Sequence, residues 1–398
     1  MIPTNRAHFE RYFHQLAVFA LINLLLIGVV AWAASTLIVS ARGLRFDFTP
    51  HLIGGRAVWN GDNPYTPEVT ARIQQAMFGR ALPPEADQQN LAYPAYSSLM
   101  LAPILALPDQ TAIAVWMAVQ FVALLWSPVL WLNALQWQPP PWIAGGLVLA
   151  LLFVFRYPMD VFVLGQFTGT VLLALSLGFW LLVNGRDALA GVVFVAATVP
   201  PTTGLPIALA LLVAHGLRGR WRGLVAFMGT LAALLLVSVS LIGNWFPDYV
   251  DILTAYSGYA EVAWAVGELR TLPLQAAFVV ALVTLSLWML WRFWKGQPHA
   301  AVDLMVMAVV VALLLLPQTG EYVLTLLIPA LVACLAETRR LAGVRAWLVR
   351  LSVILVVLSA WVYPRGTLLA LVVPLHVLLT WCFAAADRWI GEAAGAKA

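Results

Sequence analysis

Long apolar runs fill most of the chain and are separated by short polar breaks and one long polar segment. Many runs approach the roughly 20 residues that an α-helix needs to span a bilayer. None alternates as a strand would, so the runs predict helices, which satisfy their own backbone hydrogen bonds in lipid. The predicted helices cover residues 16–39, 94–107, 109–134, 142–156, 162–183, 188–200, 203–214, 222–243, 272–294, 300–316, 320–336, 346–363 and 366–388. The pattern therefore predicts an all-α, polytopic transmembrane helical bundle with about 11–13 membrane segments.

Several of these runs are only about half as long as a span and contain or adjoin proline. Such segments are typical of re-entrant or broken helices that face protein or a cavity. The first run, residues 16–39, is longer than the apolar part of a typical signal peptide, and we expect an uncleaved first helix. The chain contains no clear internal repeat and no low-complexity linker, so we predict one integral membrane domain over residues 1–398.

The long polar segment covers residues 41–93 and follows the first apolar run. Residues 51–59 are predicted to form a short helix at the membrane interface. A second helix is predicted over residues 67–78, because Thr66 is a good N-cap and is followed by proline. Residues 60–64 have the composition of a turn between the two helices.

The composition narrows the class of protein further. Hydrophobic residues make up 62% of the chain and charged residues 10%, with a mean hydropathy of +0.89, which excludes an ordinary soluble domain. The net charge of +4 comes from basic loops, and no basic-aromatic module for nucleic acid is present, so no nucleic-acid partner is expected. Cys334 and Cys382 lie in apolar runs and are expected to be small buried residues.

The charges in the loops predict an orientation. Residues 215–222, 292–299 and 339–350 are basic and are expected to face the cytoplasm by the positive-inside rule. Residues 244–270 carry four acidic residues against one arginine and are expected on the outer side. With the N-terminus inside, residues 41–93 form a large first outer loop. We predict a multi-pass plasma-membrane protein with its most polar loop on the outer face.

Three further polar breaks, at residues 156–160, 200–203 and 317–321, are predicted to share that face. This assignment requires that residues 94–107, or one pair of short helices, enter and leave the membrane by the same side. The polar interruptions of the apolar runs would then converge on one face of the bundle.

Asp47 is the strongest candidate for chemistry. It follows the first span by a few residues and lies between Arg45 and His51 in the sequence. A carboxylate at an apolar rim can serve as a general base, because burial and neighbouring charges tune its pKa. Alternatively, Asp47 is an interfacial residue that pairs with Arg45 or Arg42.

Other residues of the loop are candidates for substrate binding. His51 and Arg56 could hold an anionic head group, since the arginine fork fits phosphate, or they could anchor the loop at the interface. Asp62 and Tyr65 lie in the turn, where aspartate commonly bonds its own backbone.

Candidates also occur at the breaks between apolar runs. Tyr93 begins a short run, and Gln166 lies near a helix start, where free N–H groups favour anions. Arg156 at membrane depth costs about 2.5–3.5 kcal/mol on insertion scales, so it is expected to be paired or functional. Glu321 and Tyr322 open a later helix, where Glu321 could cap the helix or take part in catalysis.

Motifs of soluble enzymes are absent from the sequence: there is no Walker loop, no H-E-x-x-H, no G-x-S-x-G and no dinucleotide fingerprint after a strand. A metal site would have to be assembled from scattered acids, so no metal ligand is assigned.

Short elements in a fixed order give the chain a family resemblance. They are Asp47 after the first helix, the G-D-N-P-Y run of residues 61–65, the Y-P-A run from Tyr93 with later prolines, Gly165-Gln166 and Pro317-Gln318. The chain resembles the GT-C superfamily of membrane glycosyltransferases, and more narrowly glycosyltransferase family 87, the polyprenyl-phosphate-mannose-dependent mannosyltransferase-like proteins. The similarity covers roughly residues 45–330.

The resemblance implies inverting transfer of a mannose-like hexose from a polyprenyl-phosphate donor to a lipid or glycan acceptor on the outer face. Asp47 would deprotonate the acceptor hydroxyl, and residues at a cavity mouth would stabilise the leaving phosphate. The implied partners are membrane lipids, the donor and the acceptor, with no cofactor besides the donor substrate. The candidate donor-binding and substrate-binding residues are Arg45, His51, Arg56, Asp62, Tyr65, Tyr93, Arg156, Gln166, Glu321 and Tyr322.

The chain departs from the family pattern at three places. Pro200 and Pro201 stand where a lysine precedes a proline, Glu321 stands where a histidine is expected, and Thr168 replaces an asparagine. These departures leave open a changed donor, a changed acceptor, or a catalytically inactive GT-C-like scaffold. A lipid or sugar transporter or flippase is a further alternative, although the sequence shows no clear inverted repeats with midplane charges.

Overall fold

The computed structural model describes residues 6–259, 264–317, 320–362 and 367–395, and every regular element in these ranges is helical. Among the described residues, six helices are long and apolar enough to cross a membrane, and one bent pair could form a seventh span. Four shorter apolar helices accompany them. The prediction of an all-α polytopic membrane bundle is confirmed, and these eleven segments lie at the lower end of the expected range.

The elements fall into three groups by length and composition. The long helices are α1 (Arg6–Ala34), α7 (Asp109–Ala134), α13 (Arg222–Ile242), α15 (Leu272–Trp294), α18 (Gly343–Val362) and α19 (Thr367–Gly395). The shorter apolar helices are α8 (Pro141–Leu149), α9 (Tyr157–Leu164), α10 (Thr168–Val183), α11 (Asp187–Phe194), α12 (Gly204–Leu217), α16 (Ala300–Leu315) and α17 (Ile328–Glu337). The helices of the polar segments are α2 (Ser40–Arg42), α3 (Thr49–Trp59), α4 (Pro67–Phe78), α5 (Ser97–Met100), α6 (Ala102–Leu105) and α14 (Phe246–Tyr259).

Short non-α segments join several of these helices. The π-helical segments Ser35–Val39 and Ala150–Val154 follow α1 and α8. The described residues also include three 3₁₀ segments: η3 (Val195–Thr198), η4 (Ala265–Glu268) and η5 (Glu321–Leu327), which leads into α17.

Helix α7 lies at the centre of the packing, against α1 and α10. Its Trp131 stacks on Phe179 of α10 with 4.6 Å between ring centroids. In the apolar part of α7, 56% of the residues are buried, against 6% in α1 and 11% in α13 and α15. The side chains that α1, α13 and α15 leave exposed are large and apolar, as expected for helices in contact with lipid.

The predicted helices 142–156 and 162–183 have wrong boundaries. The segment Pro141–Val154 meets Tyr157–Leu164 at a bend of 64°, with Phe155 in an extended conformation and Pro158 in the first turn of α9. Gly165 then ends α9 in the left-handed region, with φ +74°, before α10 begins. The left-handed turn at Gly165 therefore divides the predicted helix 162–183 between α9 and α10.

The predicted helix 94–107 is also wrong as a continuous element, because it consists of α5 and α6. Pro103 lies at the start of α6 and cannot donate a backbone hydrogen bond to α5. The two helices predicted in residues 41–93 are present, and α4 has the predicted bounds and ends at Gly79, with φ +71°. Helix α14, in the acidic segment 244–270, was not predicted.

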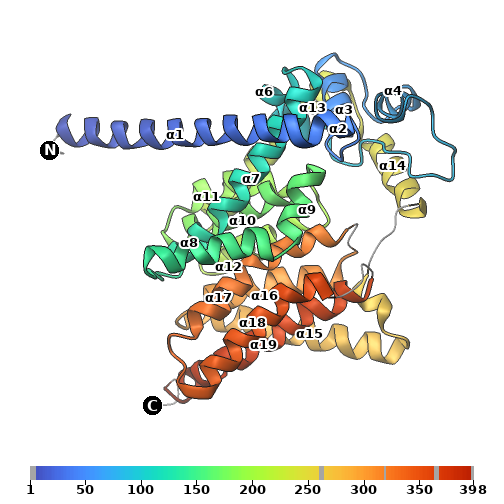
Figure 1. Cartoon of the computed structure of the whole chain (residues 1–398). Coiled ribbons are helices and arrows are strands. Elements are labelled where there is room, and N and C mark those ends of the chain that lie inside the picture. The colour runs from blue at the N-terminus through green and yellow to red at the C-terminus, as the bar shows by residue number, and fades with distance from the viewer. Residues whose placement is uncertain (1–5, 260–263, 318–319, 363–366, 396–398) are drawn as a thin grey trace.

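The polar elements gather at one end of the bundle. Helices α3, α4 and α14 lie on one side of Figure 1, whereas the beginning of α1 and the end of α19 lie on the opposite side. Asn63 in the α3–α4 turn donates a 2.5 Å hydrogen bond to Asp248, which holds α14 against this group. We refer to these as the polar end and the terminal end.

Candidate active site

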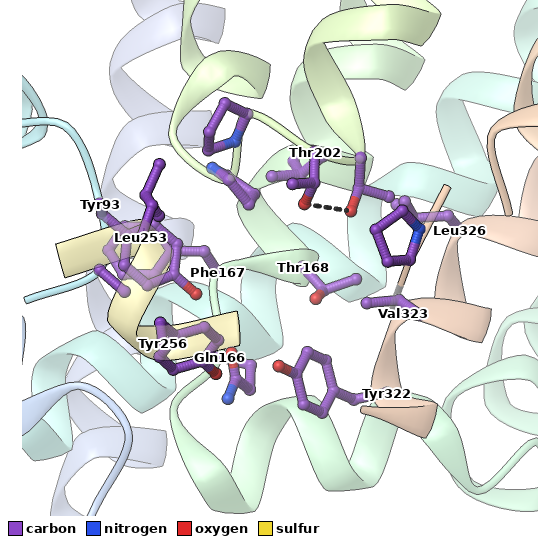
Figure 2. Close-up of a pocket in the computed structure, with 16 residues that line it drawn as sticks. Tyr93, Gln166, Phe167, Thr168, Thr202, Leu253, Tyr256, Tyr322, Val323 and Leu326 are labelled. Atoms are coloured by element: carbon purple, nitrogen blue, oxygen red, sulfur yellow. Dashed lines mark hydrogen bonds between the residues drawn. The ribbon is translucent and has the colours of Figure 1, made fainter. Parts of the chain in front are cut away.

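A cavity of about 260 Å³ opens among five separate parts of the chain (Figure 2). Its walls come from the segment before α5, the α9–α10 turn, the break between η3 and α12, helix α14 and the start of η5. The lining residues are Ala92, Tyr93, Gln166, Phe167, Thr168, Val171, Pro200, Pro201, Thr202, Thr203, Leu253, Tyr256, Pro317, Tyr322, Val323 and Leu326. The breaks at 200–203 and 317–321, which the sequence placed on a common face, thus contribute to one cavity.

Asp47 is joined to this cavity through Gln166. The Gln166 amide Nε2 donates a hydrogen bond to the Asp47 carboxylate, and the Asp47 backbone N–H donates to Leu164 O at 3.1 Å. The polar loop is therefore attached at Asp47 to the turn that forms one cavity wall.

The surroundings of Asp47 shift its acidity. The side chain reaches solvent, yet nearby protein displaces much of its water, and this desolvation raises the pKa of Asp47 above its ordinary value. The hydrogen bond from Gln166 opposes the rise in pKa. Asp87 adds to the rise by repulsion, and Arg42 reduces it by attraction. A raised pKa brings a carboxylate closer to the range in which general bases work best.

His51 belongs to an aromatic group behind the cavity wall. Its ring centroid lies 4.2 Å from that of Tyr93 and 4.3 Å from that of Phe167. The side chain is 2% exposed, and burial lowers the pKa of His51 to about 3. The imidazole is therefore neutral near pH 7 and brings no positive charge to a phosphate. Its contacts support Tyr93 and Phe167, which line the cavity.

Arg156 lies in a group of three charges beside the cavity. It donates to Glu321 at 2.6 Å and forms a 3.3 Å ion pair with Asp160, with 18% of its side chain exposed. Arg156 is thus paired, which offsets the cost of a charge at membrane depth. Glu321 is followed directly by Tyr322, so the group is tied to the cavity wall through η5.

Four other candidates from the loop do not line the cavity. Arg45 donates to Met77 O at 3.1 Å, and the exposed Asp62 pairs with Arg72 at 3.2 Å. The remaining two, Arg56 and Tyr65, make buried or half-buried contacts that fix the loop.

Arg56 donates to Leu105 O and Leu107 O and pairs with Asp109 at 2.5 Å, joining α3 to the start of α7. The hydroxyl of Tyr65 donates to Tyr93 O at 2.7 Å, so Tyr65 positions the backbone of a cavity residue. Its ring packs against Trp245 and Tyr249 beside α14.

Two parts of the site could not be recognised in the sequence. Leu253 and Tyr256 line the cavity from α14, a segment without a long apolar run. Trp116 lies in the long apolar run of α7, yet its indole N–H donates to Gly165 O at 2.8 Å. The amphipathic spacing of aromatic and acidic residues in 246–256 was the one available signal for α14.

The electrostatics of the cavity are those of a nearly neutral site. Among the described residues that line it there is no lysine, arginine or histidine. Likewise, in the described part of the chain no three His, Cys, Asp or Glu residues lie close enough together to hold a metal ion. The polar groups in the lining are the phenol groups of Tyr93, Tyr256 and Tyr322, the amide of Gln166 and the threonine hydroxyls.

The fold and this site define a polytopic helical membrane protein with a cavity of about 260 Å³ at its polar end. The model of glycosyltransferase family 87 matches residues 91–317, more than half of the chain, which therefore belongs to glycosyltransferase family 87. The match includes Tyr93, Arg156 and Gln166, whereas Asp47 and Tyr322 lie outside it. No match was found among curated proteins or among solved structures.

Proposed function

We propose that this glycosyltransferase moves a mannose-like hexose from a polyprenyl-phosphate donor to a lipid or glycan acceptor, with inversion, on the outer face of the plasma membrane. The proposal depends above all on the hydrogen bond from Gln166 to Asp47, which brings a carboxylate to the wall of the cavity. Asp47 is the proposed general base.

The proposed reaction is a single displacement. One oxygen of Asp47 takes the proton of the acceptor hydroxyl as that hydroxyl oxygen bonds to the anomeric carbon of the sugar. The bond between the anomeric carbon and the phosphate oxygen breaks, and its electron pair leaves with the phosphate. Attack from the side opposite the leaving group inverts the anomeric centre. Protonated Asp47 then returns its proton to solvent.

The lining of the cavity supports a donor with an apolar part. Val171, Pro200 and Leu326 present hydrocarbon, which suits the chain of a polyprenyl phosphate. The phenols of Tyr93 and Tyr322 can donate hydrogen bonds to sugar or phosphate oxygens. In addition, burial keeps the pKa of Tyr93 well above its ordinary value, so its hydroxyl retains its proton.

Arg156 is the proposed source of positive charge for the phosphate. It reaches the cavity wall through Glu321 and would have to exchange part of that ion pair for the donor. An arginine can offer two parallel N–H groups to a phosphate, whereas a tyrosine offers one.

The decisive experiment compares wild type with Asp47→Asn in lipid vesicles. The donors are polyprenyl phosphates carrying radiolabelled mannose or glucose, and a cell-envelope extract supplies acceptors. Loss of a general base is expected to lower transfer about a hundredfold to ten-thousandfold. Glu85→Gln removes an exposed charge from the same loop and is the matched control, with transfer expected to match wild type.

Wild-type-like transfer by the Asp47→Asn variant contradicts the assignment of the base. Failure of wild type to transfer from either donor supports the alternatives of a different donor or an inactive scaffold.

A further inference from the structure

The hydrogen bond between Asp47 and Gln166 joins two side chains that are far apart in the sequence, and each is held by its own surroundings. The Asp47 backbone is bonded to Leu164 O. Gln166 follows Gly165, whose left-handed conformation turns the chain out of α9. The Gly165 and Gln166 backbone N–H groups both donate to Val161 O, at 3.1 and 3.0 Å, which fixes the turn.

Trp116 contacts both sides of this arrangement. Its ring stacks on Phe48, the residue after Asp47, with centroids 4.8 Å apart and planes 17° apart. The same ring lies 4.6 Å from that of Phe167, the residue after Gln166. Its indole N–H donates to Gly165 O, the residue before Gln166. Trp116 is 3% exposed and comes from α7, the most central long helix.

We propose that Trp116 and Gln166 are positioning residues that hold the Asp47 carboxylate in its reactive orientation at the cavity wall. This inference rests on the proposed function. Trp116 acts through the backbone of Gly165 and the ring of Phe48, and Gln166 acts directly on the carboxylate. Gln166 thereby serves the base rather than the donor.

Such a role has a physical basis in preorganisation. A general base accelerates proton transfer only when its oxygen points at the acceptor hydroxyl, and a displacement of about 1 Å can cost a hundredfold in rate. Trp116 attaches both the turn and the loop to the central helix α7. The same rigid element therefore positions both partners of the Asp47–Gln166 hydrogen bond.

The alternative is that Trp116 is only a packed core residue. Trp131 offers a matched comparison on the same helix, because it is also buried, stacks on Phe179 and donates its indole N–H to Ser176 Oγ at 3.0 Å. Like Trp116, it lies outside the set of residues that line the cavity, but its stacking and hydrogen-bond partners, Phe179 and Ser176, belong to α10. Phenylalanine at either position keeps an aromatic ring and removes one indole hydrogen bond.

The test measures kcat, donor KM and the pH dependence of transfer for Trp116→Phe, Gln166→Met and Trp131→Phe in the same vesicles. Trp116→Phe is expected to lower kcat about tenfold to a hundredfold, with donor KM near the wild-type value. Trp131→Phe is expected to keep wild-type kcat.

Gln166→Met is expected to move the acidic limb of the pH profile to higher pH. Asp47 works as a base only when ionised, and transfer falls as the pH drops through its pKa. Gln166 lowers that pKa by hydrogen bonding, so its removal lets the pKa rise, and ionisation then requires a higher pH.

The inference is overturned if Trp116→Phe matches wild type, or if both tryptophan variants lose activity equally, which would indicate general packing. It is also overturned if Gln166→Met raises donor KM while the acidic limb stays in place, since Gln166 would then bind the donor. Asp47→Asn distinguishes failure of the positioning role from failure of the proposed function. If the Asp47→Asn variant is active, Asp47 is not the general base and the proposed function is contradicted. Loss of activity in Asp47→Asn with unchanged pH profiles in the other variants removes only the positioning role.

Discussion

The two ends of the bundle use polar residues in opposite ways. At the terminal end, five charged residues form a buried charge network, defined as Arg292, Asp303, Glu337, Arg388 and Glu392. Asp303 is 0% exposed and accepts hydrogen bonds from both arginines and from the indole of Trp389. The network links α15, α16, α17 and α19.

At the polar end, by contrast, neutral polar groups surround an open cavity. The tyrosine, threonine and glutamine side chains of the lining can reach a ligand, and the ion pairs of Arg156 stand beside the cavity. Burying an ionised group is costly unless partners replace its water, and the members of the network supply those partners for one another. The comparison teaches that the density of charge alone does not locate the proposed active site of this protein.

The largest effect on stability is expected from Asp303→Asn. It removes the charge on which two buried arginines converge, and breaking a buried pair costs about 3–5 kcal/mol. The thermal unfolding temperature in detergent should fall sharply. Asp387→Asn at the same end is the control, because the side chain of Asp387 is 69% exposed and its pair with Arg345 should contribute at most about 1 kcal/mol. Equal unfolding temperatures for the two variants would show that the network is not structural.

A smaller effect, limited to binding of the donor, is expected from Arg156→Gln. A charged hydrogen bond contributes about 1.5–3 kcal/mol, so the donor KM should rise about tenfold to a hundredfold. Arg156→Lys keeps the positive charge but loses the forked guanidinium, so its donor KM should lie between those of wild type and Arg156→Gln. Arg220→Gln breaks an ion pair with Asp187, outside the cavity lining, and should leave the donor KM unchanged. A lower unfolding temperature with unchanged KM would assign Arg156 to structure alone.

The smallest effect is expected from Asp62→Asn. Asp62 and its partner Arg72 are both about half exposed, and exposed pairs contribute about 0.2–1 kcal/mol. Transfer and unfolding temperature should therefore stay close to wild type in the same assays. A large loss of transfer would instead indicate that Asp62 binds substrate. The residues that bind substrate would then not be confined to the cavity.

The sequence by itself determined the helical class and much of the order of elements. The run 109–134 became α7 with the predicted bounds, because its length and composition leave few alternatives in a membrane. The bounds of α4 followed from Thr66, Pro67 and Gly79, whose preferences act over a few residues. Prolines and polar breaks indicated where helices would be interrupted.

Only the tertiary structure decided which of these local features meet. Asp47 and Gln166 are 119 residues apart, and nothing in either neighbourhood specifies the other. The sequence does not distinguish Trp116 from the other residues of its apolar run. Its contact with Gly165 exists only because α7 packs against that turn. Likewise, His51 and Arg56 were predicted as possible ligands for an anion, but His51 packs against the rings of Tyr93 and Phe167, and Arg56 pairs with Asp109 of α7. Periodicity and turn preferences are properties of neighbouring residues, whereas a site depends on contacts that form only when distant helices pack.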